Sequence, residues 1–146
     1  NLCALPDVKT PFEVPCKLSK NIDTVKMYIE GIWTWLQEER VVRGQPTKYL
    51  TPNTEGESRG FELKGDIGKA YKCGQLTGTF KFAIIKLKEI SGTNFPEDED
   101  PILVKYDIET GKRLSYVPIV ICKDYFILQY QYTSSITGPY TCKKIN

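Results

Sequence analysis

The sequence predicts an all-β protein: an eight-stranded antiparallel up-and-down barrel preceded by one short helix. Eight segments show apolar or aromatic residues alternating with polar ones, and short turn sequences join most of them. Successive strands joined by tight turns are antiparallel neighbours, and closing such a meander into a barrel removes its exposed edges. An open sandwich is the alternative. The length of 146 residues suits one domain.

The first part of the chain divides into a leader and a helix. Residues 1–18 contain three prolines among polar residues. Because proline fixes φ and lacks a backbone N–H, we expect an extended leader here, outside the barrel domain of residues 19–146. Between residues 19 and 30, apolar side chains recur at helical spacing, and Gly31 is placed to end the helix.

Period-two alternation begins after Gly31 and continues to the end of the chain. Two long polar loops, residues 44–57 and 91–100, interrupt the strands. The expected strands cover residues 32–42, 61–64, 67–72, 76–88, 102–108, 113–122, 125–132 and 140–145.

The inner face of the barrel is expected to be aromatic. If Trp33 points inward, period two directs Trp35 and Gln37 inward as well. Apolar alternation adds Val104 and Leu128 from later strands. The residues expected to bind a ligand are Trp33, Trp35, Phe80, Phe82, Tyr106, Tyr116, Phe126 and Tyr130. Two interpretations stay open: an apolar cup whose tyrosine hydroxyls orient a ligand, or side chains that fill the interior.

Composition excludes several kinds of site. The chain has no histidine, which excludes Ser-His-Asp and Cys-His catalysis and every His-ligated metal within it. A net charge of +2 does not suggest a nucleic-acid partner. The acidic run of residues 97–100 lacks the ligand spacing of a calcium loop, so a solvated loop is expected. We therefore expect no enzymatic activity, no cofactor and no metal site.

Five cysteines are many for a cytosolic domain of this size, and none forms a C-x-x-C pair. They indicate an oxidising compartment with one or two disulfides, although buried or free thiols are the alternative. The odd number leaves at least one thiol unpaired within the monomer. The preferred pair is Cys16 with Cys142, which would join the N-terminal segment to the last strand. No uninterrupted apolar stretch reaches membrane-spanning length.

The triplet Gly31-Ile32-Trp33 stands where the expected helix gives way to the first strand. This G-x-W spacing resembles the signature of the lipocalins. Further segments at similar intervals resemble the lipocalin-like domains of small Bacteroidetes lipoproteins over roughly residues 20–146. The segments that carry this resemblance are Gly31–Trp35, Thr51–Thr54 with Glu57–Arg59, Phe61–Leu63, Tyr71–Gly74, Gly78–Phe80 and Gly138–Lys143.

The resemblance implies an eight-stranded barrel on a lipid-anchored envelope protein without enzymatic activity. Lipocalins often pack an arginine over the motif tryptophan, and here Lys143 or Lys144 would take that place over Trp33. The anchoring cysteine would precede Asn1, together with a targeting signal that this chain lacks. The only expected contact with a membrane is through that anchor.

We therefore expect a non-enzymatic, extracytoplasmic protein of the bacterial cell envelope or outer membrane that binds a small hydrophobic or amphipathic ligand in its barrel. The alternative function is a scaffold for protein–protein interaction at the cell surface. In that case the long loops 44–57 and 91–100 would carry the contacts, because loops on rigid scaffolds often serve recognition.

Overall fold

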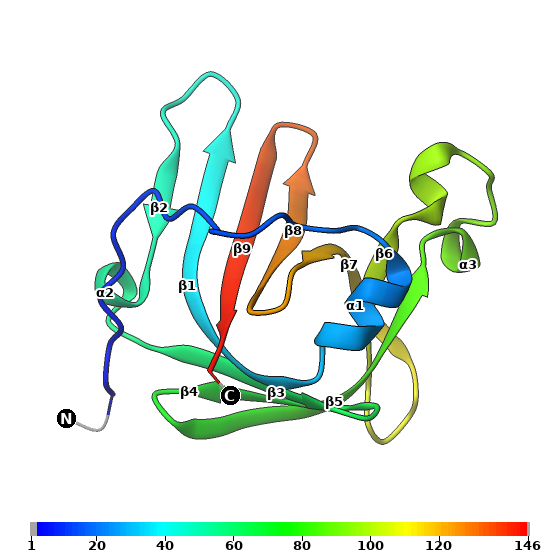
Figure 1. Cartoon of the computed structure of the whole chain (residues 1–146), viewed down its shortest axis with the longest axis horizontal. Coiled ribbons are helices and arrows are strands. Elements are labelled where there is room, and N and C mark those ends of the chain that lie inside the picture. Colours follow the sequence, from blue (N-terminus) through cyan, green and yellow to red (C-terminus); the bar gives the residue numbers. More distant parts are fainter. Residues whose placement is uncertain (1–2, 146) are drawn as a thin grey trace.

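A computed structural model describes residues 3–145 and contains a closed antiparallel barrel of eight strands, which confirms the predicted fold class (Figure 1). Each of the eight barrel strands pairs with the next barrel strand along the chain, and β1 pairs with β9 to close the barrel. The barrel strands are β1 (Gly31–Val42), β3 (Arg59–Lys64), β4 (Ile67–Lys72), β5 (Gln75–Lys86), β6 (Pro101–Tyr106), β7 (Arg113–Ile121), β8 (Tyr125–Thr133) and β9 (Ile136–Lys144).

One edge of β1 is shared between two strands. Its first residues pair with β3, and its last residues pair with β2 (Lys48–Leu50), a short ninth strand. Between β2 and β3 lies α2 (Pro52–Glu55), a single turn that begins with a reciprocal capping box between Thr51 and Thr54. The segment predicted as a 44–57 loop therefore contains secondary structure. β2 pairs with the same edge of β1 as β3 does, and α2 connects these two strands.

Helix α1 (Ile22–Tyr28) closes one end of the barrel. The Asn21 side chain caps it by accepting hydrogen bonds from the backbone N–H groups of Asp23 and Thr24. The indole N–H of Trp33 donates to the Ile29 carbonyl at 2.9 Å, which ties this helix end to the first strand. Lys144, rather than Lys143, covers Trp33: its Nζ lies 4.9 Å from the ring centroid and donates to the Tyr28 carbonyl at 2.8 Å.

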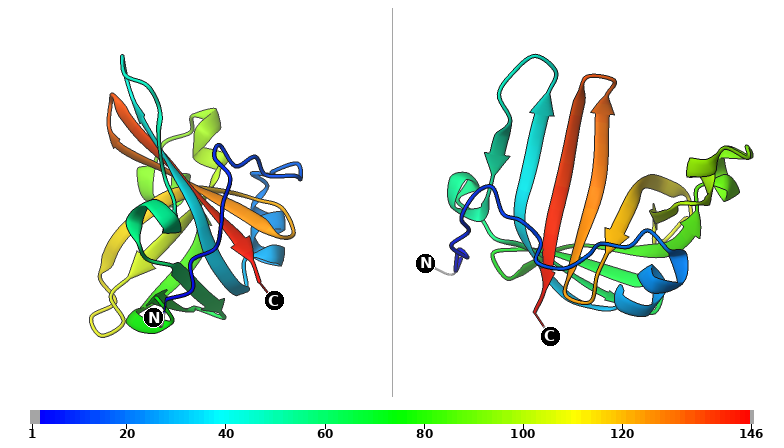
Figure 2. Two further views of the ribbon diagram at one scale, coloured as in Figure 1. Left: turned by 90° about the vertical axis from the view of Figure 1, so that its left-hand side faces the viewer. Right: turned by 45° about the horizontal axis from the view of Figure 1, so that its top comes forward.

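The N-terminal segment runs outside the barrel, across β1, β9 and β8 (Figures 1 and 2). Gln37 holds its middle, because the amide oxygen accepts from Phe12 N–H at 2.8 Å and the amide nitrogen donates to the Phe12 carbonyl at 3.2 Å. Disulfides hold both of its ends, Cys3 to Cys73 and Cys16 to Cys122.

The expected Cys16–Cys142 disulfide is therefore wrong. Cys142 is fully buried on the inner face of β9, where it lies opposite Trp35, and its thiol is free. Cys16 belongs to the outer segment, so the barrel wall separates the two thiols. Cys122 directly follows Ile121, which pairs with Ser19 in an isolated bridge, and this brings Cys122 next to the outer segment. Two disulfides fit an extracytoplasmic protein.

The second long loop contains α3 (Lys88–Ser91) and the 3₁₀ turn Pro96–Glu99. The acidic run in this loop is not uniformly solvated, because Asp98 is buried. Its carboxylate accepts hydrogen bonds from the hydroxyls of Ser91 and Thr93 and from the backbone N–H of Phe95. Asp98 therefore organises the loop. Among residues 3–145, no helix has the length and apolar character needed to cross a bilayer.

Candidate functional site

The inner face of β1 changes parity at a bulge. Trp35 lies opposite Cys142, but Gln37 lies opposite Thr141 and Glu38 opposite Tyr140. The extra residue between Trp35 and Gln37 turns Gln37 to the outside, where it binds the N-terminal segment. Strict alternation from Trp33 predicts Gln37 inside; the bulge makes this wrong and directs Glu38 inward instead.

Most of the predicted inner residues line the interior. Trp33, Trp35, Phe80, Phe82 and Phe126 belong to one buried core, and Tyr130 packs against it partly exposed. Whether any of them binds a ligand stays a prediction.

Tyr106 and Tyr116 lie on the outer face, so their expected inward orientation is wrong. The core residue Leu103 lies opposite Ile84 and Val117, which fixes Leu103 and Lys105 as the inward residues of β6. Val104 and Tyr116 pair with each other on the outer face, and Tyr116 is 48% exposed. Apolar alternation misleads here because the outer wall of β6 is itself apolar: Ile102 and Val104 are fully buried.

The lower interior, next to α1, is filled. The cavity inside it measures only about 10 Å³, which is room for one water at most. Its walls are Phe61, Leu63, Phe80, Leu103, Lys105, Phe126 and Leu128. In this part of the barrel the filled-interior interpretation therefore describes the structure.

The upper interior, at the end opposite α1, carries polar side chains. We call this group the mouth cluster: Glu38, Arg40, Arg59, Lys105, Tyr130, Tyr132 and Tyr140. Space beside the inner face is found at Gly78 in β5. Gly78 shares the inner face with Phe80, and a Cβ added at Gly78 would meet no atom within 4 Å. The barrel thus combines a filled floor with a polar and aromatic upper end, where Gly78 leaves its inner face uncovered.

Glu38 is the carboxylate of the mouth cluster, and it is buried. It accepts a hydrogen bond from Arg40 Nη2 at 2.6 Å and another from the Tyr132 hydroxyl at 3.2 Å. Gly138 makes room for this arrangement, because a Cβ there would lie 2.7 Å from the Tyr132 ring. Burial, followed by the Glu38 charge, raises the pKa of Tyr132, so this hydroxyl keeps its proton and remains a donor at neutral pH.

The tyrosines and cations of the mouth cluster stack on one another. Tyr130 lies 6.1 Å from Tyr132 and 6.0 Å from Tyr140 between ring centroids. The Arg59 guanidinium lies 4.3 Å from the Trp35 ring centroid and 3.1 Å from a Glu57 carboxylate oxygen. Burial raises the pKa of Tyr130 to about 12, so its hydroxyl is a neutral hydrogen-bonding group at physiological pH.

Lys105 differs from the two arginines because, among residues 3–145, no hydrogen bond or ion pair reaches its ammonium group. Its Nζ lies over two rings instead, 4.7 Å from the Phe80 centroid and 5.5 Å from the Phe61 centroid. Burial lowers the pKa of Lys105. Nearby in the interior, burial raises the pKa of Cys142, which keeps that thiol protonated and unreactive. The indole N–H of Trp35 is also buried, and within the described residues it has no acceptor.

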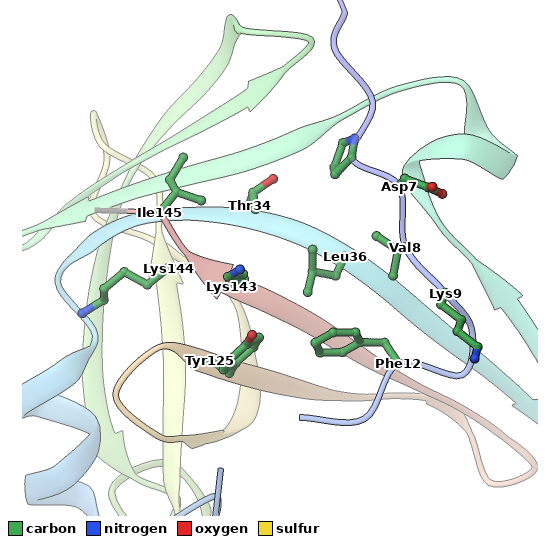
Figure 3. A pocket seen from close by; sticks show the side chains of 11 residues that line it. Asp7, Val8, Lys9, Phe12, Thr34, Leu36, Tyr125, Lys143, Lys144 and Ile145 are labelled. Carbon is green, nitrogen blue, oxygen red and sulfur yellow. The ribbon is translucent and has the colours of Figure 1, made fainter. Parts of the chain in front are cut away.

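Several hollows lie on the barrel wall. One of about 670 Å³ lies between the N-terminal segment and the outer faces of β1, β8 and β9 (Figure 3). Val8, Phe12, Leu36 and Tyr125 line it, while Lys144 points away toward α1. Another, of about 330 Å³, opens between β7 and β8, whose ladder covers only residues 119–121 and 126–128.

Sequence reasoning missed Glu38, Arg59 and Lys105. Glu38 and Lys105 read as outward polar residues of alternating strands, and only the bulge in β1 and the register of β6 reverse them. Arg59 stood at the end of a predicted loop, where no pattern indicated an inward side chain.

Comparison of the chain with family models, with characterised proteins and with solved structures finds no match. The resemblance to lipocalin-like lipoprotein domains therefore stays a prediction carried by the quoted motifs alone. Within residues 3–145, no three Cys, Asp or Glu side chains come together in a way that would hold a metal ion.

Proposed function

We propose that this chain is a non-enzymatic, extracytoplasmic binding protein that takes a small amphipathic ligand into the mouth of its barrel. The observation that carries the proposal is the mouth cluster beside the open inner face at Gly78. Polar groups inside a fold cost stability unless they are satisfied, so a barrel that served only as a structural core would favour apolar residues there. Rings and polar tips on one concave surface suit a ligand with both characters.

The filled floor limits what the mouth holds. With only about 10 Å³ free below Lys105, a ligand rests on the rings of Phe61 and Phe80 and does not traverse the barrel. A compact ligand suits this shallow site better than a long chain does.

Blocking the mouth tests the proposal. Gly78→Trp places a large ring into the open inner face, whereas Thr79→Trp adds the same ring to the outer face of the same strand. We expect wild type and Thr79→Trp to bind a neutral fluorescent probe, N-phenyl-1-naphthylamine, and Gly78→Trp to lose it. Native mass spectrometry against fatty acids, sterols and tetrapyrroles extends the search. The proposal fails if wild type binds none of these, or if Gly78→Trp binds as well as wild type.

A second candidate is a scaffold whose loops contact another protein. Phe95 favours it: this ring is 61% exposed on a loop that Asp98 organises. The 44–57 segment, with β2 and α2, is the other candidate surface. Phe95→Ser and a shortened 44–57 loop would each abolish capture of a partner from an extract, while Gly78→Trp would leave it unchanged.

Placement in a bacterial envelope follows from the lipocalin-like resemblance, and the two disulfides support an oxidising compartment. We propose a lipid anchor on a cysteine that precedes Asn1 in the full gene product. Mass spectrometry of the full product purified from membranes tests this placement, because an acylated N-terminal cysteine adds a defined mass and its absence contradicts the anchor.

A further inference from the structure

We propose that the ligand of the barrel mouth is a small monoanion, a carboxylate or sulfonate on an apolar body, and that its charged head pairs with Lys105. This inference rests on the function proposed above and adds the chemical class of the ligand.

The charge balance of the mouth cluster is the first step. Arg40 is matched by Glu38 at 2.6 Å, and Arg59 pairs with Glu57 at 3.1 Å, a carboxylate that Lys72 also reaches at 3.5 Å. Within residues 3–145, Lys105 has no such match. The Lys105 ammonium therefore stands on the inner face of the barrel without an anionic partner, and an anion that enters the mouth would meet it.

The surroundings of Lys105 are the second step. Its ammonium group lies between the floor, formed by the Phe61 and Phe80 rings, and the mouth above it. Lys105 is partly buried, and taking a cation out of water without a partner costs stability. Ring faces compensate only part of this cost, because a cation–π contact contributes roughly 0.5–2 kcal/mol. An anionic ligand would supply the missing partner.

The remaining donors of the mouth are the third step. The Trp35 N–H is buried and has no acceptor among the described residues, and Tyr130 keeps its proton. Arg40 and Tyr132 both donate to one oxygen of Glu38, Oε2, whereas within residues 3–145 the Lys105 ammonium donates to no acceptor. A ligand head rich in acceptors complements this surface, and a cationic amine does not.

The hydrocarbon body of the ligand is expected to be compact and flat. The rings of Tyr130 and Tyr140 stand edge-to-face at 6.0 Å and offer an aromatic wall, while the floor stops deeper entry. A single fused-ring or short aliphatic acid meets both conditions. An acid of either kind has the same chemistry at Lys105, and comparing benzoate-type with medium-chain fatty acids as competitors distinguishes them.

A matched pair of probes tests the inference. 1-Anilinonaphthalene-8-sulfonate and N-phenyl-1-naphthylamine share their rings and differ by the sulfonate. Lys105→Met keeps the length of the side chain and removes its charge, and the control Lys81→Met removes an exposed charge from the outer face of β5. We expect Lys105→Met to weaken the sulfonate probe by roughly tenfold to a hundredfold. The neutral probe should change by less than about twofold, and Lys81→Met should change neither probe.

Each other result has a defined meaning. If both probes bind wild type and Lys105→Met weakens them equally or not at all, the anion inference is wrong while the binding function stands. If neither probe nor any competitor binds wild type, the binding function fails as well. If Gly78→Trp keeps sulfonate binding, the anion binds elsewhere, such as the outer hollow beside Lys143, and the assignment to Lys105 is overturned. Lys105→Gln, measured in parallel, provides a second uncharged variant should the methionine variant fold poorly.

Discussion

The floor of the mouth depends on a glycine, and replacing it gives the sharpest stability prediction. Gly68 in β4 lies opposite Phe80 in β5, and the Phe80 ring lies where a side chain of residue 68 would be. A Cβ added at Gly68 would lie 2.3 Å from Phe80 Cε2 and 2.4 Å from Cζ, which is far inside van der Waals contact. Phe80 is 8% exposed and packed in the core, so a shift of its ring disturbs the neighbouring core side chains.

We therefore expect Gly68→Ala to lower the free energy of unfolding by about 1–3 kcal/mol, the usual cost of overpacking. Without the clash, replacing glycine by alanine in a strand would stabilise the protein by about 0.5–1 kcal/mol. The sign of the measured change in unfolding free energy therefore tests whether the clash exists. Because the Phe80 ring carries the Lys105 ammonium at 4.7 Å, Gly68→Ala should also weaken binding of the sulfonate probe.

The assay is urea unfolding of four proteins under non-reducing conditions: wild type, Gly68→Ala, Phe80→Leu and the double variant. Phe80→Leu alone should cost about 1–2 kcal/mol in lost burial and packing. Because leucine has no ring to cover residue 68, the double variant should be more stable than the sum of the single changes predicts, by about 1 kcal/mol or more. Additive effects, or a Gly68→Ala protein as stable as wild type, would refute the packing argument.

Three further outcomes are expected. Cys142 should be the one thiol per chain that reacts with a thiol reagent under non-reducing conditions, and only after denaturation; two or more reactive thiols would contradict the disulfide assignment. Lys144→Met should lower the free energy of unfolding by about 1–2 kcal/mol, because it leaves the Tyr28 carbonyl without its donor and uncovers Trp33; thermal unfolding beside Lys143→Met as the control measures this loss. Burial lowers the pKa of Lys105, so the unfolded chain holds this proton more tightly. Wild type should therefore gain stability relative to Lys105→Met as pH rises toward the ordinary lysine pKa of about 10.4. Urea titrations from neutral to alkaline pH measure the difference in unfolding free energy between the two proteins, and a difference that does not change with pH would disprove this expectation.

The barrel was predictable because its strands alternate strongly and its turns are short. β4 spans Ile67–Lys72, the range expected from alternation, and β8 differs by one residue. The segment from residue 44 to 57 was harder to predict. β2 has only three residues and α2 a single turn, and both depend on the free edge of β1 for their place. Thr51 followed by Pro52 and Thr54 was the local signal for α2.

The site was less predictable, because it depends on which face of each strand points inward. A single bulge after Trp35 moves Glu38 inside, and no feature of the local sequence marks that bulge. In β6, either Val104 or its neighbour Lys105 can face the interior. Hydrophobicity predicts Val104, but the structure places Lys105 there. The pairing of Leu103 with Ile84 and Val117 determines which face of β6 points inward. Such long-range pairing cannot be predicted from the sequence of one strand. The predicted disulfide was wrong for the same reason, because the pairing of cysteines also depends on long-range contacts.

The two disulfides also determine how the oxidised chain responds to mechanical tension. If residues 3 and 145 are pulled apart, force passes along residues 3–16, crosses the Cys16–Cys122 bond and continues along residues 122–145. That path covers roughly a quarter of the chain, so the covalent loop between its two cysteines, which contains most of the barrel, cannot be stretched out. A molecule held at both ends would therefore extend little before reduction and far more after it. Strands β1 to β7 lie within the covalent loop, whereas β8 and β9, which carry Tyr130, Tyr132 and Tyr140, lie on the loaded path.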